Sequence, residues 1–304
     1  MDYERILAEV AEDARPLIGR GNVAGYIPPL ASVDPAQFGI ALLTVDGRLH
    51  TGGDATKRFS IQSISKIFSL ALAFNLLDED IWKRLGREPS GTPFNSLVQL
   101  EVDAGKPRNP FINSGALVVV DVLASHFAQP EMAVMQFISR LIGKETVHVD
   151  LKLAKAEQEV AHRNIAMGHF IKSFGNLNNA VDDVIRSYCW QCSILMSCVE
   201  LVTAADFLAR GGISSATNRP VLTGNQCKRV NALMATCGTY DAAGDFAYRV
   251  GLPAKSGVGG GILAVVPGRA TICVWSPGLD ATGNSLAGGF ALERLAQLTG
   301  WSIY

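Results

Sequence analysis

The first part of the chain shows helical and then strand-like spacing of its apolar residues. Residues 3–18 place their apolar side chains on one face, which predicts an amphipathic helix. Residues 38–45 form a short apolar run, and Asp46-Gly47 after it is a strong hairpin signal. We therefore expect a strand over 38–45 and an antiparallel return strand over 48–52.

The middle of the chain, from about residue 67 to residue 210, is mostly helical in pattern. Apolar residues recur every three or four positions in the segments 116–127, 133–142, 151–174, 181–187 and 196–209. The loops between these segments are polar or rich in glycine.

The C-terminal part returns to strands. A helix is predicted over 228–235 and strands over 247–252, 261–266 and 271–276. A closing helix is predicted over 284–298, with Asn284 as its N-cap.

Strands at both ends and helices between them indicate an α+β fold. One antiparallel sheet would be built from both termini, and the helical block would form a second lobe. The expected division is a sheet-containing lobe of residues 1–66 together with 211–304, and a helical lobe of residues 67–210. A cleft between two such lobes is a natural ligand site.

Composition narrows the possible partners. The 304 residues suit one or two domains, and a net charge of -1 without any basic run argues against nucleic acid or an anionic membrane. The acidic, amphipathic N-terminus does not resemble a signal peptide, and no stretch of 18 uncharged apolar residues occurs. These features predict a soluble, cytoplasmic protein.

The cysteines and histidines give no sign of a metal or redox site. In a cytoplasmic chain the six cysteines are expected to be free thiols. Cys189 and Cys192 form a C-x-x-C, but no thioredoxin-like strand or second ligand pair accompanies it, which favours a structural role.

Ser63 and Lys66 stand at the start of a run that is apolar almost all round. Residues three apart share a helical face, so the two side chains can meet. An amine in an apolar setting has a lowered pKa. Either Lys66 extends its amine to water, or it takes a proton from Ser63. Ser60 is the expected N-cap of this helix, and Ser65 has no assigned role.

Lys255-Ser256-Gly257 precedes a predicted strand in a glycine-rich stretch. The alternative is a plain edge strand, because the spacing fits no phosphate loop. The triplet resembles the Lys-Thr-Gly that accompanies Ser-x-x-Lys in penicillin-recognising enzymes.

Several segments together resemble the bacterial serine-dependent glutaminases, over nearly the whole chain. The matching segments are Tyr26 to Leu30 (YIPPL), Val45 to Gly47, Gln62 to Lys66 (QSISK), Asn109 to Ala116 (NPFINSGA), Lys172 to Asn176 (KSFGN), Gly251 to Gly261 (GLPAKSGVGGG), Trp275 to Pro277 and Gly283 to Ser285. The resemblance implies the β-lactamase/DD-peptidase-like fold and hydrolysis of L-glutamine to L-glutamate and ammonia.

The resemblance also implies the catalytic residues. Ser63 matches the nucleophile, Lys66 the lysine that helps to deprotonate it, and Tyr240 the tyrosine that relays protons. Tyr26 matches the tyrosine of the Tyr-Ile-Pro motif at the site. A γ-glutamyl ester would form on Ser63, with its oxyanion held by the backbone N–H groups of Ser63 and Val258.

The substrate contacts implied by the resemblance lie mostly in the helical block. Asn113, Glu157, Asn164 and Tyr188 match those positions. Glu157 suits the ammonium of glutamine, and amide and hydroxyl donors suit its carboxylate. Glu157 and Asn164 lie seven apart, so they would share a helical face.

Each of these assignments has a plain structural alternative. Asn113 could only cap a helix that begins near Ser114. The neighbours of Glu157 are typical of a solvated helix face, and Tyr188 and Tyr240 could be half-buried core residues.

Two other functions remain open at this point. One is a β-lactamase or DD-peptidase, although the middle motif of those enzymes has no clean copy here, since Cys189 and Trp190 follow Tyr188. The other is an inactive binding scaffold. The glutaminase resemblance implies no metal or organic cofactor, L-glutamine as the small-molecule partner, and a homodimer or homotetramer.

Overall fold

A five-stranded antiparallel sheet joins the two ends of the chain. The computed structural model describes residues 1–90, 97–144 and 147–304. The strand order is β2-β1-β8-β7-β6, and every neighbouring pair is antiparallel. The strands are β1 (Gly39–Thr44), β2 (Leu49–Gly53), β6 (Ala254–Ser256), β7 (Gly261–Val266) and β8 (Ala270–Trp275). The prediction of an α+β fold, with one antiparallel sheet built from both termini, is confirmed.

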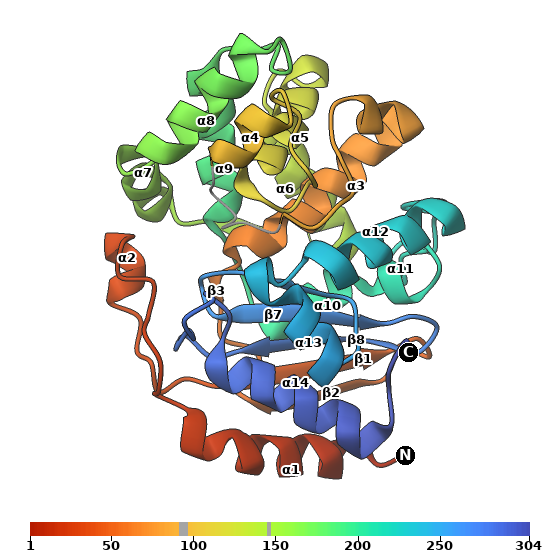
Figure 1. Ribbon diagram of the computed structural model, residues 1–304. Coiled ribbons are helices and arrows are strands. Elements are labelled where there is room, and N and C mark those ends of the chain that lie inside the picture. Colours follow the sequence, from red (N-terminus) through yellow and green to blue (C-terminus); the bar gives the residue numbers. More distant parts are fainter. Residues whose placement is uncertain (91–96, 145–146) are drawn as a thin grey trace.

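One face of this sheet is covered by the first and last helices, α1 (Tyr3–Ala14) and α14 (Leu286–Thr299), which lie side by side (Figure 1). The Asp2 carboxylate accepts a hydrogen bond from the Arg5 backbone N–H and caps α1. Leu7 and Val10 of α1 are buried in one apolar cluster with Leu295 of α14. This layer explains the amphipathic pattern at the N-terminus.

The other face carries the helical block, shown above the sheet in Figure 1. Its central helices are α3 (Ser65–Leu77), α5 (Asn113–His126), α6 (Pro130–Ile142), α9 (Val181–Cys192) and α10 (Cys198–Ala204). The α3 helix is apolar nearly all round because helices and sheet surround it, and its residues from Ser65 to Ala71 are all buried.

Shorter elements complete the fold. The remaining helices are α2 (Pro28–Ala31), α4 (Val98–Val102), α7 (Leu151–Glu159), α8 (His162–Ser173), α11 (Asp206–Ala209), α12 (Gly224–Cys237) and α13 (Ala243–Arg249). The 3-10 turns are η1 (Arg15–Leu17), η2 (Gln62–Ile64), η3 (Asp78–Lys83) and η4 (Tyr240–Ala242). The domain boundaries expected near residues 66 and 210 stay a prediction.

A small second sheet was not expected from the sequence. It pairs β3 (Phe59–Ser60), β5 (Ile194–Met196) and β4 (His148–Val149) in the order β3-β5-β4. Strands this short show no alternating pattern. The sheet ties the segment before Ser63 to the end of α9.

Three predicted elements are wrong. The helix expected over 196–209 is two helices, α10 and α11, and Met196 belongs to β5. Residues 247–252 are not a strand, because α13 continues to Arg249 and β6 begins only at Ala254. The aromatic and β-branched residues there favour a strand locally, but Phe246 packs into the core from a helix. Residues 151–174 form two helices instead of one, since α7 ends at Glu159 and α8 begins at His162.

The start of α14 differs by one residue from the prediction. Ser285 is the N-cap, and its hydroxyl accepts from the Gly288 N–H at 3.1 Å. The Asn284 amide instead donates to the Thr239 carbonyl at 3.2 Å. Asn284 therefore ties the last helix to the loop that carries Tyr240.

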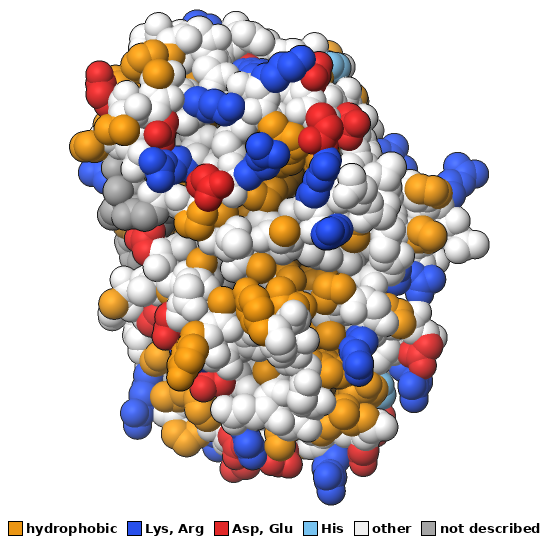
Figure 2. Space-filling model, turned by 45° about the vertical axis from the view of Figure 1, so that its right-hand side comes forward, with side chains coloured by type: hydrophobic (Ala, Val, Ile, Leu, Met, Phe, Trp, Pro, Cys, Tyr) orange, Lys and Arg blue, Asp and Glu red, His pale blue; other side chains and the backbone are white. Residues whose placement is uncertain are grey.

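The cysteines and the surface complete the description. All six cysteines are free and buried. Lysine, arginine and acidic side chains are interspersed on the face shown in Figure 2, and hydrophobic side chains gather across its middle. Across the described ranges, no single helix is long and apolar enough to cross a membrane; α5 and α6 would suffice only together, and they meet at 95°.

Candidate active site

A cavity of about 330 Å³ contains every predicted site residue except Lys66. It is lined by Tyr26, Ile27, Gln62, Ser63, Asn113, Glu157, Val160, Ala161, Arg163, Asn164, Tyr188, Tyr240 and Val258. These residues come from both ends and from the middle of the chain, so the fold gathers into one place what the sequence separates widely.

Ser63 lies on the short 3-10 turn η2, just before α3. The predicted N-cap is wrong: Ser60 lies on β3, and its hydroxyl donates to the Cys192 carbonyl at 2.9 Å. Gln62 adopts a φ of 48°, a left-handed value that is uncommon outside glycine. The Ser65 hydroxyl donates to the Gln62 carbonyl at 2.7 Å. The turn that presents Ser63 is thus bent, and local hydrogen bonds hold it.

The glycine-rich stretch after Lys255 packs directly on this turn. A Cβ atom on Gly257 would lie 2.5 Å from the Ile61 carbonyl oxygen, and one on Gly259 would lie 2.1 Å from that of Ser60. No side chain fits in such a gap. The glycines therefore let the Val258 backbone approach the backbone beside Ser63.

Lys66 is buried, with 1% of its surface exposed, so the alternative in which its amine reaches water is excluded. Its Nζ donates to the Phe111 carbonyl at 3.1 Å and to Asn113 Oδ1 at 2.8 Å. Burial lowers the pKa of this amine to about 8. A neutral amine has two N–H bonds and one lone pair, and these two acceptors leave the lone pair available for a proton.

Tyr240 is the first residue of the turn η4 and lines the same cavity as Ser63. Its side chain hydrogen-bonds to Ser63, and its hydroxyl also donates to the Ser256 carbonyl at 3.2 Å. Burial raises the pKa of the phenol well above its ordinary value. Tyr240 is therefore protonated at neutral pH, which suits a proton relay better than a resting base.

Asn113 is the centre of a polar network in the helical block. Its Oδ1 accepts from the Tyr188 hydroxyl at 3.2 Å as well as from Lys66, and its Nδ2 donates to Asn164 Oδ1 at 3.1 Å. It is the first residue of α5 and its side chain caps no backbone group, so the capping alternative is wrong. Tyr188 is buried, with its hydroxyl in this network, so it is more than core filling.

Glu157 is buried at the end of α7, which contradicts the solvated-face alternative. Burial raises the pKa of its carboxyl to about 7, although Gln62 Nε2 lies 3.4 Å from it and the Cys192 thiol also hydrogen-bonds to it. The expectation that Glu157 and Asn164 share one helical face is wrong, since Asn164 belongs to α8. Both nevertheless line the same cavity.

Tyr26 and Val258 form other parts of the cavity wall. Tyr26 remains 62% exposed, whereas Val258 is buried in an apolar cluster with Ile27. Sequence reasoning missed Gln62 and Arg163, which also line the cavity. Gln62 directly precedes Ser63, and that adjacency was the available signal. Arg163 gave none, because a lone arginine on a polar helix is ordinary.

The nearby thiols are not activated. Burial raises the pKa of Cys189 and Cys192 above that of an ordinary thiol, so neither is a ready nucleophile. Within residues 1–90, 97–144 and 147–304, no three His, Cys, Asp or Glu side chains are grouped to hold a metal ion.

Comparisons with known proteins identify the family of the chain. The glutaminase family model matches residues 21–304. The chain is 56% identical to a glutaminase of Paraburkholderia phytofirmans and 56% identical to one of Ralstonia nicotianae, each over 304 residues and the full length of both chains.

Solved structures are similar as well. A probable glutaminase of Bacillus subtilis superposes with a TM-score of 0.92 at 32% identity, covering 100% of this chain and 98% of that one. A probable glutaminase from the same organism, complexed with 6-diazo-5-oxo-L-norleucine, gives a TM-score of 0.88 at 32% identity over the same shares. These similarities support the β-lactamase-like fold.

Proposed function

The chain belongs to the glutaminase family, hydrolases that act on an amide C–N bond, and we propose that its cavity binds L-glutamine and that Ser63 attacks the side-chain amide. The observation that carries the proposal is one cavity that places Ser63 next to Tyr240, with a buried carboxylate, Glu157, in the same wall. Glutamine needs a nucleophile at its amide and a counter-charge for its ammonium.

The substrate orientation follows from charge. The ammonium pairs with Glu157, whose ionised form it stabilises by replacing the water lost on burial. The α-carboxylate takes donors from the Asn164 amide nitrogen, since the amide oxygen already accepts from Asn113. Arg163 adds a positive charge in the same wall. Tyr26, which is 62% exposed, borders the bound substrate.

Acylation of Ser63 requires removal of its proton. The neutral Lys66 amine is the final acceptor, because its pKa lies near neutrality whereas the phenol of Tyr240 stays protonated. Tyr240 accepts the proton from Ser63 while its own phenolic proton passes to Lys66. Tyr240 later protonates the departing ammonia.

The backbone N–H groups of Ser63 and Val258 are assigned to the oxyanion. Each such donor contributes roughly 3 kcal/mol to stabilising the transition state in other enzymes. Ammonia leaves, a γ-glutamyl ester remains on Ser63, and water then hydrolyses it to L-glutamate. The chemistry assigned to these residues requires no metal or organic cofactor.

Removal of the nucleophile tests this scheme. Ser63→Ala is expected to abolish ammonia release from L-glutamine while calorimetric binding of L-glutamate survives, because the variant loses only the attacking oxygen. A variant that keeps its rate would overturn the covalent mechanism. Ammonia release from L-asparagine, measured in parallel, shows whether the site accepts a side chain that is one methylene shorter.

The alternative functions receive less support. The relatives and the structure reported above are glutaminases. Labelling of Ser63 by a fluorescent penicillin would instead support a penicillin-recognising enzyme. An inactive scaffold would have no use for the Ser63, Lys66 and Tyr240 arrangement. We further propose a cytoplasmic homodimer or homotetramer, to be checked by light scattering on the purified chain.

A further inference from the structure

Lys255 is a second completely buried lysine, and the scheme above gives it no task. It lies on β6 opposite Leu263 of β7, and its exposed fraction is 0%. Burying an amine is costly unless its hydrogens find acceptors. It is not among the residues that line the substrate cavity. Its role must therefore be exerted on protein groups.

Both hydrogen bonds of the Lys255 side chain go to carbonyl groups close to Tyr240. Its Nζ donates to the Gly238 carbonyl at 2.9 Å, two residues before Tyr240. It donates also to the Ser256 carbonyl at 2.7 Å, the oxygen that accepts from the Tyr240 hydroxyl. The same Nζ lies 4.6 Å from the centroid of the Tyr240 ring, so the amine faces the ring. Burial lowers the pKa of this amine well below its ordinary value.

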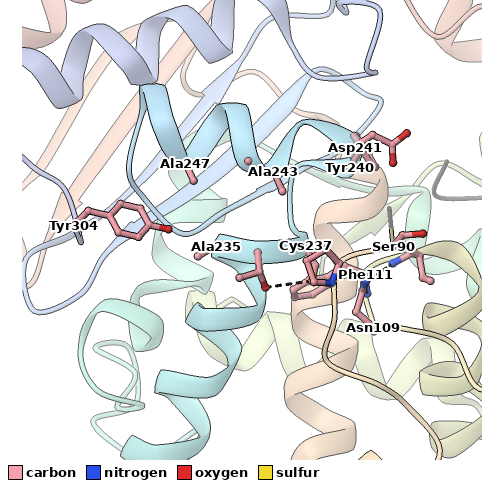
Figure 3. A pocket seen from close by; sticks show the side chains of 14 residues that line it. Ser90, Asn109, Phe111, Ala235, Cys237, Tyr240, Asp241, Ala243, Ala247 and Tyr304 are labelled. Carbon is pink, nitrogen blue, oxygen red and sulfur yellow. Dashed lines mark hydrogen bonds between the residues drawn. The ribbon is translucent and has the colours of Figure 1, made fainter. Parts of the chain in front are cut away.

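Tyr240 needs such support. Its φ is 56°, a left-handed value that is uncommon and strained for a residue other than glycine. The ring borders the substrate cavity and also a second cavity of about 560 Å³, which Phe111 lines as well (Figure 3). Tyr240 therefore lines two cavities, and its position depends on the contacts that the surrounding protein makes with it.

We propose that Lys255 is a positioning residue for Tyr240, which it holds against Ser63 through the Gly238 and Ser256 carbonyls and the face of the phenol ring. The inference rests on the proposed function, since Tyr240 acts there as the proton relay. Lys255 touches no reacting atom. Its Nζ also lies 5.9 Å from the Phe111 ring centroid, and the Phe111 carbonyl accepts from Lys66. Phe111 thus lies close to both buried amines.

A double-mutant cycle tests the role. Lys255→Met keeps the length of the side chain and removes the amine with both of its hydrogen bonds. We expect kcat for ammonia release to fall roughly 100-fold, the lower end of what a positioned proton-transfer group contributes, with KM within about threefold. In a Tyr240→Phe background the same change should cost less than about threefold, because residues that act through one another are not additive.

The matched control is Thr271→Val on β8. This variant also removes a buried donor to a backbone carbonyl, that of Val202 at 2.9 Å, but far along the sheet from Tyr240. It should lower the melting temperature while kcat stays within about threefold, because it leaves the Tyr240 loop untouched. If Lys255→Met does not fold, Lys255→Gln, which keeps amide donors on a shorter side chain, enters the same cycle.

The outcomes separate the two proposals. Ammonia release by the wild-type chain decides the substrate. If the wild type is active and the losses from Lys255 and Tyr240 add, or if kcat of the Lys255 variant is unchanged, the positioning role is overturned while the glutaminase activity stands. If the wild type releases no ammonia from L-glutamine, both are overturned.

Discussion

Lys66 and Glu157 are both almost completely buried, and each has its pKa moved toward neutrality. Burial is the main cause in both cases, since it disfavours whichever form is charged. The carboxyl pKa rises to about 7 and the amine pKa falls to about 8. The groups that the proposed mechanism assigns to binding and to proton removal therefore change state within the same pH range.

The pH dependence of kcat/KM follows from these two values. Glutamine binding needs Glu157 ionised, which requires a pH above about 7. Proton removal needs Lys66 neutral, which requires a pH above about 8. The logarithm of kcat/KM should rise with a slope of about two in acid, about one in between, and level off in mildly alkaline buffer. Initial rates across this range measure it, and a flat profile would contradict both assignments.

Glu157→Gln separates the two titrations. The amide keeps the size of the side chain but removes the charge and the titration, so KM should rise about 10- to 100-fold, the value of a charged hydrogen bond. The acid slope of log kcat/KM should fall from about two to about one. An unaltered KM would exclude Glu157 as the ammonium partner.

At the scale of elements, the site depends on close packing between the glycine-rich segment after β6 and the turn η2. The two backbones can approach each other closely because the glycines have no side chains, and not because side chains attract one another. Gly289, in contrast, lies on α14 with nothing within 4 Å of an added Cβ. Gly259, in the glycine-rich segment, and Gly289 therefore give a matched pair of sites for substitution by alanine.

Gly259→Ala should displace the backbone at Ser60, because the new Cβ would lie 2.1 Å from its carbonyl oxygen. A shift of about 1 Å at a catalytic group costs roughly 100-fold in rate elsewhere, and we expect kcat/KM to fall by that order. Gly289→Ala should leave kcat/KM unchanged and stabilise the chain slightly, by up to about 1 kcal/mol. Equal activity of the two variants would show that the close approach is not needed.

At the scale of the whole molecule, the sheet separates two apolar cores. The core under α1 and α14 lies on the far side of the sheet from α3 and the helical block. The substrate cavity borders the core of the helical block and not the core under α1 and α14. Stability and catalysis are therefore expected to respond separately to changes on the two faces.

Leu7→Ala tests this separation. Leu7 is 1% exposed in the core beneath the sheet, so its truncation should lower the free energy of unfolding by about 2–5 kcal/mol. Urea denaturation measures the loss, and KM for glutamine should not change at room temperature. A KM shifted severalfold would mean that the two cores are coupled through the sheet.

Local pattern predicted the elements whose partners are close in sequence or whose apolar face is continuous. The hairpin at Asp46-Gly47, the amphipathic α1 and the apolar α3 are of this kind. The pattern failed where tertiary contacts decide, as in α13, in the break between α7 and α8, and in the short strands of the second sheet. In these segments the local preference for one type of secondary structure was weak or was opposed to the tertiary packing.

The sequence alone determined which chemical groups are present and much of the secondary structure. It placed Ser63 and Lys66 one turn apart, and the resemblance of separate motifs indicated which distant residues belong with them. The tertiary structure decided the rest. Lys66 is excluded from solvent and donates hydrogen bonds to the Phe111 carbonyl and to Asn113. Glu157 is buried, and Lys255 lies against Tyr240. These properties depend on solvent exclusion and on contacts between segments far apart in the chain, which only the folded protein brings together.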